Sequence, residues 1–140
     1  MISFNSAEIS FNLKNKKALK FWIKSVVQEK NRKTGDISFV FCTDDYLLEI
    51  NKQYLNHDTL TDIITFDYSK ENPQQAISGD IFISIERVKE NAKKFNKTFE
   101  NELNRVMIHG VLHLLGYGDK TPKDKVEMTR QEDLCLKLLN

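Results

Sequence analysis

Two histidines near the C-terminal end of the chain have the spacing of metal ligands. His109 and His113 are four residues apart within residues 106–115, a segment that is otherwise almost entirely apolar and predicts a buried helix. On a helix this spacing places both imidazoles on one face, where they can bind a single metal ion. A lone histidine on an apolar helix is more often a core residue, but the pair favours metal binding.

Gly116 and Asp119 complete the pattern. Gly116 follows the apolar segment and can adopt the left-handed conformation that ends a helix. The resulting turn would bring Asp119 under the helix end as a third ligand. Two imidazole nitrogens and one carboxylate oxygen leave a fourth position for water or substrate, as in catalytic metal sites.

The elements that must position these residues can be predicted from periodicity and turn signals. Apolar residues at helical spacing alternate with β-rich runs, and Thr98 is the expected N-cap of the helix that carries the histidines. We expect a single domain over residues 1–140 with a mixed α/β fold, in which helices pack on a sheet of about four strands. The strands are expected within residues 1–13 (or a hairpin there) and at 37–42, 62–68 and 79–84, with a turn at 33–36. The helices are expected at 15–31, 44–54, 85–96, in the metal-binding segment, and from 122 to the C-terminus.

Composition excludes several classes of protein. The 140 residues are enough for a core without disulfides, and Cys42 and Cys135 lack the C-x-x-C spacing, so they are expected to be core thiols. We find no signal-peptide pattern and no apolar run long enough to cross a membrane, which predicts a cytoplasmic protein.

The net charge of +1 hides an uneven distribution. Residues 1–33 hold eight Lys or Arg against two Glu, whereas residues 34–72 hold two Lys against eight acids. The basic first helix could attract phosphates, although a solvated helix face explains the same lysines equally well. Possible RNA contacts are Lys14, Lys16, Lys17, Lys20, Lys24, Lys52 and His57.

The sequence resembles the YbeY family of bacterial rRNA maturation factors, which are metal-dependent endoribonucleases. The resemblance rests on residues 109–119 (His-Gly-Val-Leu-His-Leu-Leu-Gly-Tyr-Gly-Asp), followed by Met128. It extends to residues 51–55, 61–66 and 79–81. It implies cleavage of single-stranded RNA, maturation of the 3′ end of 16S rRNA and ribosome quality control, with one Zn²⁺ per chain and ribosomal RNA, the small ribosomal subunit or its proteins as partners. The chain is expected to be a monomer or a weak oligomer.

The chain departs from the family pattern at two positions. Asp119 stands where most of the family has histidine, and this anionic ligand predicts a weaker Lewis acid and makes Mn²⁺ or another divalent ion more plausible. Leu55 stands where the family has an arginine thought to contact RNA, and a leucine cannot bind a phosphate.

Two other functions compete with RNA cleavage. A ribosome-associated assembly factor could bind RNA or a ribosomal protein and use the metal mainly for structure, which Leu55 favours. A zinc metalloprotease would share the ligand spacing, but such enzymes carry a glutamate as general base directly after the first histidine, and here that residue is Gly110.

Overall fold

One mixed sheet organises the computed structural model, which describes residues 1–55, 61–69 and 76–139. Its spatial order is β1-β2-β4-β3, with β1, β2 and β4 parallel and β3 antiparallel to β4. This confirms the predicted mixed α/β fold, the four strands and the pairing of the two strands on either side of the long connection. The strands are β1 (Ile2–Ser6), β2 (Thr34–Cys42), β3 (Ile63–Asp67) and β4 (Ile77–Ser84).

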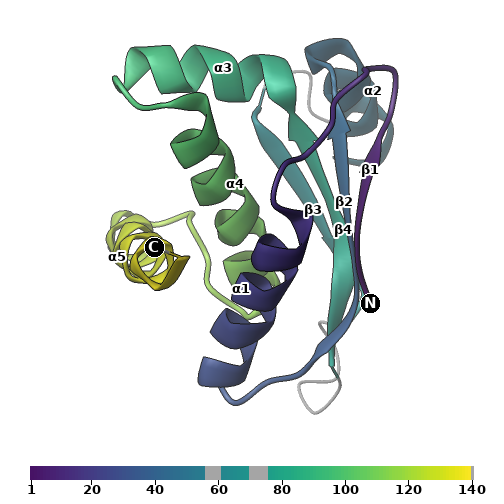
Figure 1. Cartoon of the computed structure of the whole chain (residues 1–140). Helices are drawn as coiled ribbons and strands as arrows, with labels where there is room; N and C mark the ends of the chain where they lie inside the picture. The colour runs from purple at the N-terminus through teal and green to yellow at the C-terminus, as the bar shows by residue number, and fades with distance from the viewer. Residues whose placement is uncertain (56–60, 70–75, 140) are drawn as a thin grey trace.

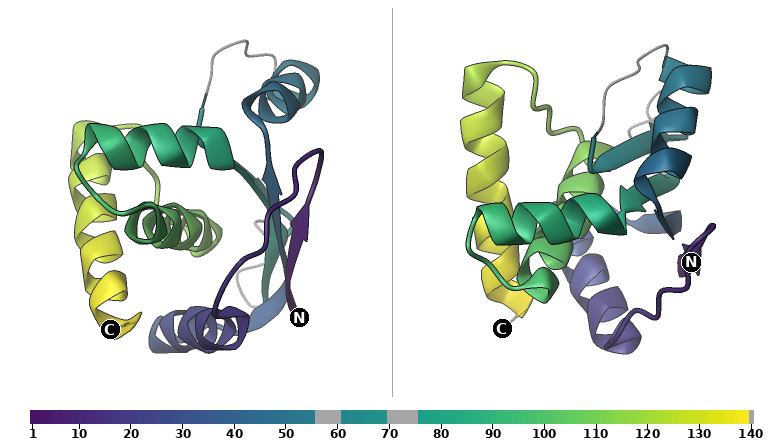
Figure 2. Two further views of the ribbon diagram at one scale, coloured as in Figure 1. Left: turned by 45° about the horizontal axis from the view of Figure 1, so that its top comes forward. Right: turned by 90° about the horizontal axis from the view of Figure 1, so that it is seen from above.

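Helices cover the two faces of the sheet unequally. Helices α1, α3, α4 and α5 contribute to the main core on one side, and α2 lies on the other side (Figures 1 and 2). Their positions agree with the prediction to within about two residues at most ends. The helices are α1 (Lys16–Glu29), α2 (Asp44–Leu55), α3 (Ile85–Lys94), α4 (Phe99–Leu114) and α5 (Pro122–Leu139).

Helix α4 is the centre of the thicker layer. It contacts α3, α5, β3 and β4, and Figure 2 shows it enclosed between these elements. This position explains why its sequence is apolar on nearly every side. The main core lies between it and the buried face of β4, formed by alternate residues such as Ile77, Ile81 and Ile83.

In the N-terminal third one prediction was wrong, and of the two alternatives for residues 1–13 the structure shows the strand rather than the hairpin. The turn expected at residues 33–36 belongs largely to β2, which begins at Thr34 and continues through a register shift before Ile37. Gly35 permits this, because a Cβ there would lie 2.9 Å from the carbonyl oxygen of Ile77. The N-terminal strand ends at Ser6 and runs parallel to β2, so it forms no hairpin.

Cys42 and Cys135 are buried free thiols, as predicted. Trp22 is buried too, and its Nε1 donates a hydrogen bond of 2.8 Å to the backbone oxygen of Cys135. No helix in the described ranges combines the length and the apolar character that a membrane crossing requires.

Candidate metal centre

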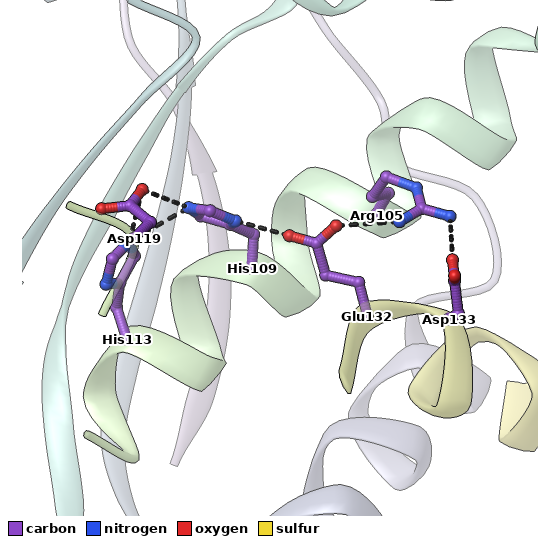
Figure 3. Close-up of polar contacts among 6 residues, drawn as sticks. All are labelled: Arg105, His109, His113, Asp119, Glu132 and Asp133. Carbon is purple, nitrogen blue, oxygen red and sulfur yellow. Dashed lines mark hydrogen bonds and ion pairs between the residues drawn. The ribbon is translucent and has the colours of Figure 1, made fainter. Parts of the chain in front are cut away.

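The end of α4 brings the predicted ligands together. The helix begins at Thr98, whose hydroxyl accepts a hydrogen bond of 3.0 Å from the amide of Asn101, as expected for its N-cap. It ends in a turn at Gly116, which has a φ of 105° and whose amide donates to the carbonyl of His113. This left-handed glycine confirms the predicted helix stop. The chain then returns so that Asp119 faces both histidines (Figure 3).

The three side chains form a compact set of donor atoms. Nε2 of His109 and Nε2 of His113 are 3.0 Å apart, and Oδ2 of Asp119 lies 3.4 Å from each of them. Tetrahedral ligands about 2.0–2.1 Å from an ion lie about 3.3–3.4 Å from one another. The observed distances therefore fit one small divalent ion, and these are the three described residues that could together hold one.

A buried carboxylate holds His109 from behind. Oε2 of Glu132, on α5, lies 2.6 Å from Nδ1 of His109, and its side chain is only 9% exposed. Its other oxygen accepts a hydrogen bond of 2.8 Å from Arg105, which also pairs with Asp133 (Figure 3). Because a carboxylate only accepts, Nδ1 of His109 carries the proton and Nε2 is left free to bind a metal.

The two histidines have opposite pKa shifts. Burial alone would lower the pKa of His109, but the hydrogen bond and charge of Glu132, together with Asp119, outweigh it and raise the pKa above the ordinary 6.5. Burial lowers the pKa of His113, and the charge of His109 lowers it further. His109 is therefore the site's first proton acceptor.

The ligands lie in a cleft of about 850 Å³ between α4 and the edge strand β3. Its described walls are acidic, because five of the described lining residues carry carboxylates and one, Arg105, carries a guanidinium. Burial raises the pKa of Asp62, at the start of β3, and that of Glu102, on α4. The five carboxylates belong to Asp62, Asp67, Glu102, Asp119 and Glu132.

Gly110 is in close contact with the sheet. A Cβ at this position would lie 2.8 Å from Cγ2 of Ile81 and 3.0 Å from Cδ1 of Ile63. A glutamate cannot occupy the position without moving α4 away from the sheet. The place where a metalloprotease would carry its general base is therefore filled by the packing of α4 on β3 and β4.

The six lysines predicted to contact RNA are not brought to the cleft. None of the six lysines is among the described residues that line it. Lys52 is 4.0 Å from Glu49 on the same helix. His57 and the side chain of Leu55 lie outside the described residues. Met128, which belongs to the family pattern, is buried in the main core.

Sequence reasoning missed Glu132 and Arg105, and it did not place Asp62 in the site. A signal for Glu132 was available, because it lies four residues after Met128 and three before Cys135, on the buried face of α5. A carboxylate on a buried helical face needs a partner. Of the four apolar residues that indicate this helix, Val126, Leu134 and Leu138 are exposed, and Leu139 packs partly against the main core.

Comparison with known proteins agrees with this geometry. The family model described as Endoribonuclease YbeY matches residues 1–140. The chain is 54% identical to Endoribonuclease YbeY of Flavobacterium psychrophilum, covering all of this chain and 97% of the relative, and 46% identical to that of Parabacteroides distasonis, covering 99% and 95%. It is also similar to the solution structure of TM1509 from Thermotoga maritima, with a TM-score of 0.68, 29% identity and coverage of 99% and 89%. The chain therefore belongs to the Endoribonuclease YbeY family.

Proposed function

We propose that this protein is a metal-dependent endoribonuclease that cleaves single-stranded ribosomal RNA, including the 3′ end of 16S rRNA, and that it acts on the small ribosomal subunit. The family supports the reaction class. The observation that carries the proposal is the set of three ligand atoms 3.0–3.4 Å apart on the floor of an open cleft. A cleft of this kind leaves room for a phosphodiester beside the ion.

His109, His113 and Asp119 would hold the metal, with zinc or manganese as the expected ion. Such an ion supplies Lewis-acid polarisation of a phosphate oxygen and a bound water of lowered pKa. Glu132 keeps Nε2 of His109 directed into the cleft. The acidic walls repel RNA phosphates everywhere except beside the three ligands, so they favour placement of one phosphodiester at the site of reaction.

The test is cleavage of a 16S rRNA fragment that carries an unprocessed 3′ extension. Protein with verified metal content should cut this RNA, a chelator should stop the cut, and added Zn²⁺ or Mn²⁺ should restore it. His113→Ala should be inactive while keeping the circular dichroism spectrum of the fold. Failure of folded, metal-loaded protein to cut any ribosomal RNA fragment would contradict the proposal.

The same experiment distinguishes a ribonuclease from the alternative function, a ribosome-associated assembly factor with a mainly structural metal. If the metal were mainly structural, His113→Ala would lower stability but would not change ribosome association, and the wild-type protein would bind small subunits without cutting RNA. A catalytic metal predicts the loss of cleavage with association retained.

A further inference from the structure

The outward face of α1 combines an exposed aromatic ring with lysines. Phe21 is 74% exposed, and Lys17 and Lys24, four residues before it and three after it, are exposed as well. This spacing places all three on one helix face. The opposite face carries Leu19, Trp22 and other core residues, and Figure 2 shows α1 at the margin of the molecule.

This face has an unbalanced positive charge. From its start to Gln28, α1 contains no acidic residue. Lys17 and Lys24 form no ion pair with any residue in the ranges that the structure describes. A large aromatic side chain between two free ammonium groups is the composition of a platform for single-stranded nucleic acid, in which bases stack on the ring and lysines attract phosphates.

The acidic lining of the cleft gives an attractive surface outside it a role in RNA binding. Five carboxylates line the cleft, so an RNA strand gains little electrostatic attraction there except from the ion. Affinity for a polyanion depends mainly on contacts between basic side chains and phosphates. Among the described residues, the cleft offers only Arg105 as a permanently charged basic side chain for such contacts, and the lysines of α1 lie outside it.

We propose that Lys17, Phe21 and Lys24 form a second binding site for single-stranded RNA, in which Phe21 stacks on one base and the two lysines pair with flanking phosphates. The proposal rests on the proposed function, because it assigns this site to a distal part of the RNA that is cleaved. The charge distribution predicts contacts between lysines and RNA phosphates, and the proposal adds a stacking contact by Phe21.

The C-terminal end of α1 connects this site to the metal centre. Nζ of Lys30 lies 5.4 Å from the ring centroid of Tyr117, and Tyr117 lines the cleft. Lys30 and Tyr117 also line a smaller hollow of about 280 Å³ beside the glycine turn. At 1.5 Å per residue, Phe21 lies about 14 Å along the helix from Lys30. Nine residues are also about two and a half turns, so Phe21 lies on the opposite side of α1 from Lys30, and a strand that leaves the cleft past Tyr117 passes around the helix to reach this face.

Helix α3 supplies a matched control. Phe95 at its end is 54% exposed, but Nζ of Lys94 already lies 5.6 Å from its ring centroid. The helix also carries Glu86 and Glu90 among its basic residues. Phe95 is therefore an exposed phenylalanine like Phe21, but it lies in a region of mixed charge.

The test measures binding of fluorescent RNA to the full chain in the presence of a chelator, so that no cleavage occurs. One RNA has about 16 nucleotides and the other about 4. Phe21→Ala should weaken binding of the longer RNA about tenfold, and Phe21→Trp should restore it. Lys17→Ala combined with Lys24→Ala should reduce the slope of log affinity against log salt by about 1.4. Phe95→Ala should change neither value.

Unchanged binding of the longer RNA by Phe21→Ala, or an equal loss in Phe95→Ala, would overturn the proposal. So would a loss of binding to vesicles containing phosphatidylserine without a loss of RNA binding, because that result assigns the face to a membrane surface. With metal present, Phe21→Ala should raise the KM for the longer RNA and leave kcat unchanged. An inactive wild type would refute the proposed function, whereas the binding result stands without catalysis.

Discussion

His109 and His113 have the same side chain on the same helix, yet different parts of the molecule hold them in place. His109 is held by Glu132, 23 residues further along the chain on α5, and Glu132 is in turn held by Arg105. His113 faces Asp119 at the local turn that follows α4, and its side chain is more exposed than that of His109. One half of the centre therefore depends on tertiary packing and the other on a local glycine turn.

This difference indicates a division of roles. The His109 half is rigid and electrostatically balanced, because a buried carboxylate and a guanidinium fix its imidazole before any metal arrives. The His113 half is more accessible, since the side chain of His113 is 26% exposed and that of His109 is 19% exposed. We expect variants of the His109 half to affect stability and metal binding together, and variants of the His113 half to affect metal binding alone.

Removal of either histidine should have the largest effect. His109→Ala and His113→Ala should each lower ribonuclease activity about a thousandfold or more, because two ligands no longer retain the ion. Only His109→Ala should also destabilise the metal-free protein, by about 1–3 kcal/mol, since it deprives buried Glu132 of a donor. Urea unfolding under chelating conditions measures the second effect, and equal losses of stability in the two variants would refute the division.

Glu132→Gln should have the next largest effect. The substituted amide would keep a hydrogen-bond acceptor for His109 but lose the charge, so metal affinity should fall about 10- to 100-fold. Glu132→Ala removes the acceptor as well, so its metal affinity should be lower than that of Glu132→Gln. Competition with a coloured chelator measures the affinity, and Co²⁺ absorption reports the ligand geometry. The matched control is Asp133→Asn, which alters the other partner of Arg105 without touching His109. Similar losses in both variants would contradict the role of Glu132.

The same division explains how much the sequence could predict. The His113 half could be predicted from local chemistry. The two histidines are one helical turn apart, and Gly116 and Asp119 follow within six residues of His113 at the end of the helix. The packing of α5 against α4, which places Glu132 behind His109, depends on contacts between distant segments. Periodicity cannot give such contacts, since it shows which residues are buried but not what they are buried against.

The strands show a similar limit. Runs of β-branched and aromatic residues predicted β2 and β4, and in the structure most of their buried residues repeat at every second position. These runs could not predict the start of β2 at Thr34, where Gly35 is typical of a turn but instead allows close approach to β4. The approach of β3 to α4, which makes Asp62 part of the cleft, likewise follows from the register of β3 on β4.

The pH dependence of metal binding should separate the two histidines further. In the metal-free protein, His109 should titrate above 6.5 and His113 below it, as measured by NMR of the ring protons. Because His109 must lose its second proton to bind a metal, affinity should fall about tenfold per pH unit below its pKa. Protonated His109 also stabilises the metal-free fold below pH 6.5, and this contribution should be lost as the pH rises through the raised pKa. In Glu132→Gln, the onset of both effects should move to lower pH; an unchanged onset would mean that Glu132 does not set this pKa.

Asp62→Asn should have the smallest effect and act only on the His109 half. The charge of Asp62 raises the pKa of His109, and burial raises the pKa of Asp62 itself. A carboxyl group whose pKa is raised in the folded state costs stability as the pH rises through its unfolded pKa of about 3.9. Asp62→Asn should therefore increase the unfolding free energy of the metal-free protein at about pH 7 but not near pH 3.

The metal affinity of Asp62→Asn should fall only a few-fold, because a cation is attracted by the carboxylate that the substitution removes. Urea unfolding of the metal-free wild type and variant at the two pH values measures the difference in unfolding free energy. A destabilised metal-free Asp62→Asn at neutral pH would mean that attraction between Asp62 and protonated His109 outweighs the cost of burial, and the two residues would then belong to one coupled proton-binding unit.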